Sequence, residues 1–328
     1  MLIKPSRLQL VATAALMAFA ATQAVAGVGF SPEVLGALVI NASNLSAIYQ
    51  GFKTAFKNAF DGVQPDYQKI ATVVPSTTKT ENYGWLAAWP QLREWIGDRQ
   101  IKSLQAFGYS ITNKKFESSV GVPRDDIEDD TYGVFGTLFG EMGYAASTHP
   151  DSLCFPALAA GTSTVCYDGQ YFFDVDHPVG SGVVSNWGGG SGTAWYLLET
   201  RRALKPLIFQ KRREYDFKAM NSLQDEGVFM RDEYRYGVDA RCNVGYGLWQ
   251  LAFGSKQTLD ETGFEAACVA LQTMKDDEGR PLGIKGNLLV VPPALEKAAL
   301  KLVRSATLAN GADNPYFGRA DVLVSAYL

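Results

Sequence analysis

The amino-acid sequence predicts an α+β protein, and three patterns support this fold class. Apolar residues recur at helical spacing in 40–60. Apolar and polar residues alternate along 107–126 with the period of two that is typical of β-strands. Near the C-terminus, a short apolar strand at 287–291, a helix starting at Pro293 and a closing strand at 320–328 follow one another. This last run predicts a sheet flanked by helices.

Composition limits the class of protein further. The 328 residues leave room for roughly two domains of about 150 residues each. A hydrophobic content of 47% indicates a folded core, and a net charge of −4 argues against a surface that coats nucleic acid, which would be basic. The four cysteines make neither a disulfide framework nor a CxxC pair for structural zinc; they are Cys154, Cys166, Cys242 and Cys268.

The first 26 residues have the pattern of a secretory signal peptide. Lys4 and Arg7 precede an apolar run, 8–24, which ends in Ala-Val-Ala before Gly27. An alanine-rich helical arm is the alternative interpretation. Polar residues interrupt the run, so a true membrane span is not expected, and no later stretch is long and apolar enough to cross a bilayer.

Two elements are predicted between residues 40 and 127. The first is an amphipathic helix at 40–60, whose apolar stripe consists of Leu45, Ile48, Tyr49, Phe52 and Phe56. The second is a long β-hairpin over about 82–123, in which the alternating part turns around Asn113. A hairpin whose two faces are both mixed cannot bury itself, so it should lie against another surface.

A second helix is predicted from Thr131, with the acidic residues of 124–130 at its positive N-terminal end. Glycine costs about 1 kcal/mol relative to alanine inside a helix. A stripe of four glycines therefore indicates close approach of another backbone or a helix that bends. The stripe consists of Gly133, Gly136, Gly140 and Gly143.

Weaker signals mark the elements that follow. A short helix is expected after Pro150, and then a hairpin over 166–179 with Asp168 and Gly169 at its turn. Residues 195–255 are strand-like and rich in Arg, Tyr and Trp. A capping box from Thr258 to Glu261 is predicted to open the next helix.

Motifs for catalysis are scarce. His149 and His177 are the only histidines, and neither HExxH nor GxSxG occurs. The glycine-rich stretch 188–193 lacks the lysine of a phosphate-binding loop. The sequence therefore predicts no catalytic residue, no cofactor-binding residue, no cofactor and no metal site.

Two carboxylate-rich stretches bear on this prediction. His177 lies between Asp176 and Pro178, close to Asp174, and a metal site or general base is the alternative interpretation. A scaffold role at the end of a strand is favoured. Proline lacks the backbone N–H that would continue the pairing between strands, and aspartate accepts hydrogen bonds in turns. The acids of 124–130 lack the alternating pattern of a calcium loop and precede a helix, so a helix N-terminus is favoured over calcium binding.

Seven long and unusual stretches occur in a fixed order. They read INASNLSAIYQGFKTAF, YGWLAAWPQLREWIGDR, NKKFESSVGVPRDDIEDD, YDGQYFFDVDHPV, VFMRDEYRYGVDAR, GYGLWQLAFGSK and DDEGRPLGIKGNLLVVPP. Together they resemble the major head (capsid) subunit of Mu-like bacteriophages, from about Ile40 to Leu328. That family is understood to adopt the Hong Kong 97-type capsid fold, so the resemblance implies this fold here.

The resemblance also implies a division of the chain. It assigns 40–71 to an N-terminal arm and 72–127 to an extended hairpin loop. It assigns 128–189 to a peripheral domain with a long spine helix, and 190–328 mainly to an axial α/β domain. Residues 1–39 lie outside the resemblance and are treated as a signal-like N-terminal extension.

The function implied is that of a structural virion protein rather than an enzyme. It would self-assemble in the host cytoplasm into an icosahedral head shell, as hexamers and pentamers, together with scaffold and portal proteins. The shell would enclose phage or prophage DNA without sequence-specific binding, and no membrane would be involved. The alternatives are a secreted enzyme or binding protein with a cleaved signal peptide, and an encapsulin-like compartment shell.

Under this resemblance the extended loop contacts a neighbouring subunit. Tryptophan and arginine are enriched among the residues that dominate interface energies, whereas exposed ion pairs contribute about 0–1 kcal/mol each. The sequence therefore predicts an assembly interface in which tryptophans supply most of the contact energy and charges set the register. Its residues are Trp89, Arg93, Glu94, Trp95, Asp98 and Arg99.

Overall fold

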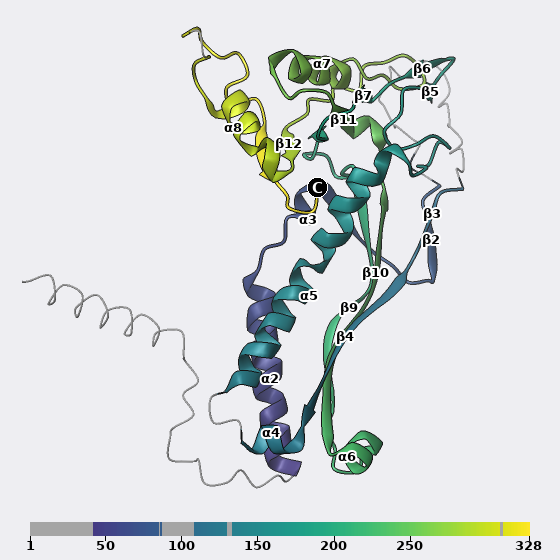
Figure 1. The fold of residues 1–328 in the computed structure, drawn as a ribbon. Coiled ribbons are helices and arrows are strands. Elements are labelled where there is room, and N and C mark those ends of the chain that lie inside the picture. Colours follow the sequence, from purple (N-terminus) through teal and green to yellow (C-terminus); the bar gives the residue numbers. More distant parts are fainter. Residues whose placement is uncertain (1–41, 85, 87–107, 130–132, 309–310) are drawn as a thin grey trace, which may run out of the picture.

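The computed structural model describes residues 42–84, 86, 108–129, 133–308 and 311–328. These residues form an elongated molecule with a long lower part and a compact upper part (Figure 1). Two helices and a four-stranded sheet make the long part, and a five-stranded sheet with two further helices makes the compact part. The predicted α+β class is confirmed.

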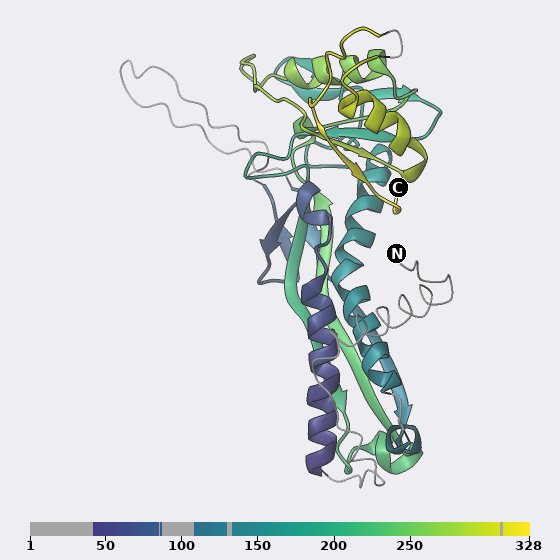
Figure 2. The same cartoon turned by 90° about the vertical axis from the view of Figure 1, so that its left-hand side faces the viewer.

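Helix α2 (Ala42–Gly62) confirms the amphipathic helix expected at 40–60. Its aromatic stripe meets the rest of the long part, where the ring of Phe52 lies 4.6 Å from that of Phe139 and 5.3 Å from that of Tyr236. Figure 2 shows α2 and α5 running side by side along the long strands. Aromatic pairs add to the stability gained by burial, so this cluster holds α2 in place.

Helix α5 (Val134–Ala159) is one continuous helix of 26 residues. It runs through Pro150 and Pro156, so the expectation of a separate short helix after Pro150 is wrong. A proline inside a helix removes a backbone hydrogen bond and costs about 3 kcal/mol or more. Burial of the α5 face beyond Pro150, at Phe155 and Leu158, offsets this cost.

The glycine stripe of α5 contains one close approach to another backbone. A Cβ added at Gly143 would lie 2.2 Å from the backbone oxygen of Phe56 in α2, whereas one added at Gly136 or Gly140 would meet nothing within 4 Å. The acids expected at the start of this helix lie instead on a separate short helix, α4 (Arg124–Glu128).

The sheet of the long part has the strand order β1-β9-β10-β4. Strand β10 (Glu233–Tyr246) pairs antiparallel with both β9 (Leu207–Met220) and β4 (Lys114–Pro123). Strand β1 (Ala71–Pro75) pairs parallel with β9. The sheet thus joins strands that are far apart in the sequence.

This pairing differs from the predicted hairpin and also divides the range 190–328 between the two parts of the molecule. Among the described residues of the predicted hairpin, only β2 (Thr80–Asn82) and β3 (Ser110–Thr112) pair with each other, and β4 leaves them to join β10. Strands β9 and β10 fall in 190–328, yet they lie along α5 instead of in the compact part (Figure 1). Alternation identifies a strand but does not identify its partner.

The five-stranded sheet of the compact part confirms the C-terminal strand–helix–strand unit. Its order is β13-β12-β8-β11-β7, and β12 and β13 pair in parallel. Helix α8 lies between these two strands in the sequence, and α7 precedes them. The bounds are β7 (Trp187–Gly190), β8 (Trp195–Leu198), β11 (Ala252–Lys256), α7 (Glu261–Gln272), β12 (Leu288–Val291), α8 (Glu296–Arg304) and β13 (Asp321–Val324).

The N-terminus of α7 differs from the predicted capping box. Asp260 is the N-cap, and its side chain accepts a hydrogen bond of 2.8 Å from the backbone N–H of Gly263. A carboxylate at this position satisfies one of the free N–H groups of the first turn. The cap therefore lies two residues beyond Thr258.

The hairpin expected over 166–179 is formed in part. Asp168 and Gly169 lie at a turn, where Gly169 has a φ of 92° and an isolated bridge joins Val165 to Tyr171. His177 begins strand β5 (His177–Val179), which pairs with β6 (Gly182–Val184), so it does not end a strand as expected.

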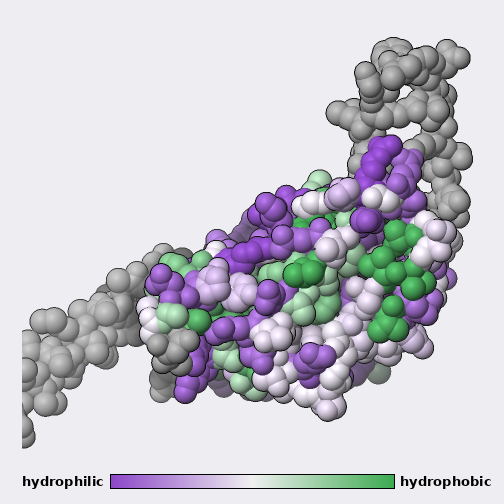
Figure 3. Space-filling model, turned by 90° about the horizontal axis from the view of Figure 1, so that it is seen from above, coloured by the Kyte–Doolittle hydropathy of each residue, from purple (hydrophilic) through white to green (hydrophobic). Residues whose placement is uncertain are grey.

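Short elements complete the chain, and two hydrophobic cores hold it together. The larger core includes Trp195 and Trp249, and the smaller one lies around Phe139 and Phe217. Seen from the upper end, the surface mixes hydrophilic residues with groups of hydrophobic ones (Figure 3). The short elements are α3 (Tyr67–Ile70), η2 (Ala160–Thr162), α6 (Glu226–Arg231), η3 (Trp249–Leu251) and η4 (Pro293–Leu295).

Candidate assembly surfaces

The six residues of the predicted interface lie in 87–107, outside the described part of the chain. The structure describes the residues on either side of this segment, the paired strands β2 and β3, which we call its base. Strands β2 and β3 pair from Thr80 opposite Thr112 to Asn82 opposite Ser110. The two ends of the segment therefore leave the molecule side by side.

A carboxylate holds this base together. One oxygen of Glu81, Oε1, accepts hydrogen bonds from the backbone N–H groups of Thr77 (2.7 Å) and Thr78 (2.9 Å) and from the Ser76 hydroxyl (2.9 Å). These bonds to the charged form lower the pKa of Glu81 to about 2. The turn before β2 is therefore fixed by an ionised side chain at neutral pH.

Further hydrogen bonds fix the base to the long sheet. The Tyr83 hydroxyl donates to Oε1 of Gln210 on β9 at 2.8 Å, and the Gln210 side-chain amide donates to the backbone oxygen of Ile111 at 3.1 Å. Asn113, expected at a turn, donates its amide to the Ser76 hydroxyl at 2.8 Å. Because Gln210 and Ile111 are buried, the segment starts from a rigid support.

The histidine singled out from the sequence lies in a buried cluster near β5. His177 Nδ1 lies 2.7 Å from Oδ2 of Asp168, and the thiol of Cys166 donates to Oδ1 of the same carboxylate at 3.1 Å. The imidazole also stacks on the indole of Trp249, with ring centroids 3.9 Å apart. Its neighbours Asp174 and Asp176 are not its hydrogen-bond partners: Asp174 accepts from the backbone N–H of Val175 at 2.7 Å instead, and Asp176 is exposed.

This cluster has some of the features of a metal site. One ligand atom each from Cys166, Asp168 and His177 lies within 4.8 Å of the others, a donor set that would suit a transition metal. Burial raises the pKa of Cys166, and its thiol proton is donated to Asp168, so a metal here would have to displace that proton and break this hydrogen bond. Burial opposes ionisation of Asp168, yet hydrogen bonds from His177 and Cys166 hold its pKa below the usual value.

The cluster is therefore best described as a structural tie. Asp168 lies at a turn and His177 begins β5, so their contact fixes this strand to the preceding loop. The scaffold role that the sequence favours for His177 agrees with this geometry. The sequence predicts Asp168 only as a turn residue, because nine positions separate it from the histidine.

The other histidine lines an apolar groove. His149 Nδ1 lies 2.6 Å from the hydroxyl of Tyr215. The ring of Phe116 packs edge-on against the imidazole, with ring centroids 4.4 Å apart. The groove holds about 230 Å³ and runs between α5, with Met142, and the edge strand β4. Burial lowers the pKa of His149, so the groove carries no charge from this residue at neutral pH.

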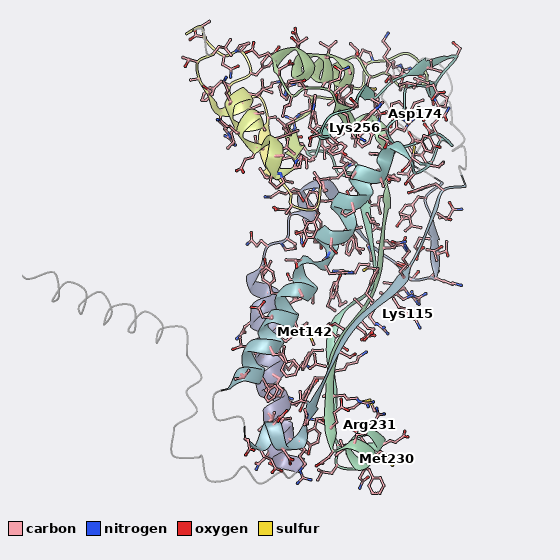
Figure 4. The ribbon with its side chains drawn as sticks, in the orientation of Figure 1. Lys115, Met142, Asp174, Met230, Arg231 and Lys256 are labelled. Carbon is pink, nitrogen blue, oxygen red and sulfur yellow. The ribbon has the colours of Figure 1, made fainter. Side chains whose placement is uncertain are left out.

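The far end of the long part exposes apolar side chains. We call this end the tip; it comprises residues 121–129 and 220–235, including α4 and α6. Phe229 is 83% exposed and Met230 is 68% exposed. Figure 4 shows Met230 and Arg231 at the end opposite the compact part. Sequence reasoning missed them, because periodicity does not reveal whether an apolar triplet such as 228–230 is buried.

The fold has a solved counterpart in a phage head. The subunit in the procapsid of bacteriophage JBD30 superimposes with a TM-score of 0.80 at 51% identity, covering 88% of this chain and 100% of that chain. Among the described residues, no helix is both long and apolar enough to span a bilayer. The fold is thus that of a phage capsid shell protein of the Hong Kong 97 type, as the sequence predicts.

Sequence relatives identify the family. The profile of the Mu-like prophage major head subunit gpT matches residues 45–328. The Mu-like prophage FluMu major head subunit of Haemophilus influenzae (strain Rd) is 45% identical, covering 79% of this chain and 88% of its own length. The major capsid protein of Escherichia phage Mu is 38% identical over 89% of this chain and 100% of its own length. The chain belongs to the Mu-like major head subunit family and is a capsid protein of the phage head.

Proposed function

We propose that this chain self-assembles, as hexamers and pentamers, into an icosahedral shell that encloses phage or prophage DNA. The observation that carries the proposal is the match to a procapsid subunit over that subunit's entire length. An acidic chain, with a net charge of −4, would contain DNA without reading its sequence. Assembly in the host cytoplasm, with scaffold and portal proteins as partners, belongs to the same proposal, as does the absence of enzymatic activity.

We also propose a division of labour along the chain. Residues 40–71 act as the N-terminal arm. Residues 72–127 contain the extended loop, whose base is the β2–β3 pair, while β4 at the end of this range joins the long sheet. Residues 128–189 form the peripheral domain, whose spine helix is α5. Most of 190–328 forms the axial domain, but β9 and β10 from this range pair with β4 and extend the peripheral part. Residues 1–39 remain an N-terminal extension.

Within the extended loop, Trp89 and Trp95 act as anchors on a neighbouring copy. Arg93, Glu94 and Asp98, together with Arg99, set the register of that contact. The paired base at β2 and β3 supports this role, since a loop presented from a rigid base loses less conformational entropy on binding.

The test is sedimentation and electron microscopy of particles from cells that express the full chain. Trp95→Ala, or Arg93→Glu combined with Arg99→Glu, should leave a folded subunit that no longer forms shells. Trp95→Phe, and Arg93→Lys with Arg99→Lys, are the matched controls and should retain assembly. Normal particles from the disruptive variants would remove this loop from the interface, and loss of folding by circular dichroism would place it in the subunit's own core.

A further inference from the structure

Strand β4 leaves one edge of the long sheet unpaired. It is the last strand in the order β1-β9-β10-β4, and its pairing with β10 runs from Lys114 to Pro123 without a shift of register. Within the described residues, no backbone hydrogen bond joins β4 to any strand other than β10. A regular unpaired edge offers its N–H and C=O groups to an additional strand.

The apolar groove described above opens beside this edge. Met142 and Ala145 of α5 line one side of it, and Phe116 and Ser118 of β4 line the other. A cavity of about 150 Å³ holds a benzene molecule, so the 230 Å³ of this groove accommodate a valine or leucine side chain. Successive side chains of a strand point to opposite faces. An extended segment on the β4 edge would therefore direct every second side chain toward the groove.

The charges of β4 are not compensated by its partner strand. Lys115 lies opposite Arg241, and Glu117 lies opposite Asp239. Like charges directly opposite each other destabilise a sheet. Lys115 and Glu117 are both exposed, and neither forms an ion pair within the described part of the chain. A segment on the free edge can compensate both charges, because its side chains would lie opposite theirs.

These features define the side chains of a complementary segment. Phe116 and Ser118 face the groove, whereas Lys115 and Glu117 belong to the other face of the strand. Figure 4 shows Lys115 on the side of the long strands away from Met142 of α5. Antiparallel pairing is slightly more stable per residue than parallel pairing. An antiparallel segment fits when it reads apolar–basic–apolar–acidic, from the residue opposite Ser118 to the residue opposite Lys115.

The chain itself does not supply such a segment. No run of its sequence reads apolar–basic–apolar–acidic. The reverse order, which parallel pairing would need, occurs at 216–219, 233–236 and 239–242, on β9 and β10. The residues between acid and base in these runs are Phe217, Tyr234 and Ala240, and all three are buried in the subunit's own core. The complementary segment therefore belongs to another protein.

We propose that the free edge of β4 and the adjacent groove bind an extended segment of another protein, which joins the long sheet as a fifth strand. Backbone hydrogen bonds to β4 hold the segment, and the groove takes its apolar side chains. Its basic residue pairs with Glu117 and its acidic residue with Lys115, which fixes the register. The proposal concerns the single subunit and does not depend on assembly into a shell.

The probe is the peptide fluorescein-Thr-Val-Lys-Val-Glu-Thr-amide, and its binding to the full chain is measured by fluorescence anisotropy. We expect saturable binding, weakened at least about tenfold when Lys115→Glu is combined with Glu117→Lys. The same double variant should bind the charge-swapped peptide, in which lysine and glutamate exchange places, more tightly than the wild-type chain does. Absence of saturable binding up to about 1 mM peptide, or no preference for either charge pattern, would overturn the proposal.

Filling the groove tests the apolar part. Ala145 is exposed, so Ala145→Trp should leave the circular dichroism unchanged while weakening peptide binding at least about tenfold. Ala266→Trp is the matched control, because Ala266 is exposed on α7 in the compact part. Equal peptide affinity of the two variants would exclude the groove from the site. A loss of self-association in sedimentation that is confined to Ala145→Trp would show that a second copy occupies the groove, which also overturns the proposal.

Alternate N-methylation of the peptide tests whether it pairs as a strand. Only every second N–H group of an added strand points toward β4, and the others point to solvent. One peptide is N-methylated at both valines, and the other at lysine and glutamate. We expect their affinities for the wild-type chain to differ at least about tenfold, because only one of them loses its hydrogen bonds to β4. Equal affinities would mean that the peptide does not extend the sheet.

Discussion

The imidazole Nδ1 of His177 lies 2.7 Å from Oδ2 of Asp168, and the two side chains are 0% and 5% exposed. A buried contact of this kind joins the turn at Asp168 to the first residue of β5. The adjacent indole of Trp249 covers the imidazole face. The contact therefore stabilises the fold of the compact part.

Removing either member of this pair should destabilise the subunit. His177→Ala leaves a buried carboxylate that has lost its main partner, and we expect a loss of about 3 kcal/mol in the free energy of unfolding. Guanidinium chloride unfolding followed by circular dichroism measures this loss. Asp176→Asn, a change at an exposed neighbour, should alter stability by less than about 0.5 kcal/mol. Equal stability of the two variants would mean that the pair contributes nothing.

The turn at Glu81 should respond to acid in a defined direction. The folded-state pKa of Glu81 is about 2, below the value near 4.3 of an unfolded glutamate. The stabilisation is therefore fully present above about pH 4.3 and is lost as the pH falls toward 2. Glu81→Gln should remove this part of the pH dependence. Unfolding measured between pH 2 and 5 for both chains checks it, and identical pH profiles would contradict the assignment.

Gly143 and Gly140 make a matched pair on α5. Gly143→Ala places a Cβ 2.2 Å from the Phe56 carbonyl oxygen, so we expect a loss of about 2–3 kcal/mol as α2 is pushed away. Gly140→Ala meets nothing within 4 Å and should stabilise the helix by up to about 1 kcal/mol. Thermal unfolding of both variants provides the comparison. A neutral Gly143→Ala would show that the two helices can separate at no cost.

The cap of α7 can be assigned by two substitutions. Asp260→Ala removes the acceptor of the Gly263 N–H and should cost about 1 kcal/mol. Thr258→Ala should cost less than about 0.5 kcal/mol, because Thr258 is exposed and does not cap the helix. The urea midpoints of the two variants show whether Asp260 or Thr258 caps α7. A larger loss of stability from Thr258→Ala than from Asp260→Ala would support the capping box expected from the sequence.

Some features follow from the sequence alone because their signals are local. The apolar stripe of α2 and the strand–helix–strand unit at the C-terminus depend on residues a few positions apart, and the structure confirms both. The seven long stretches likewise identify the Mu-like head subunit family without any structure, because motifs of this length do not coincide by chance.

Tertiary structure alone decides which distant segments meet. Strand β4 pairs with β10, more than a hundred positions along the chain, and Asp168, not Asp176, meets His177. Helix α5 continues through Pro150 because the packing of its face outweighs the lost hydrogen bond. Exposure of Phe229 is likewise invisible in the sequence, since an apolar residue is exposed or buried only by what the rest of the chain places over it.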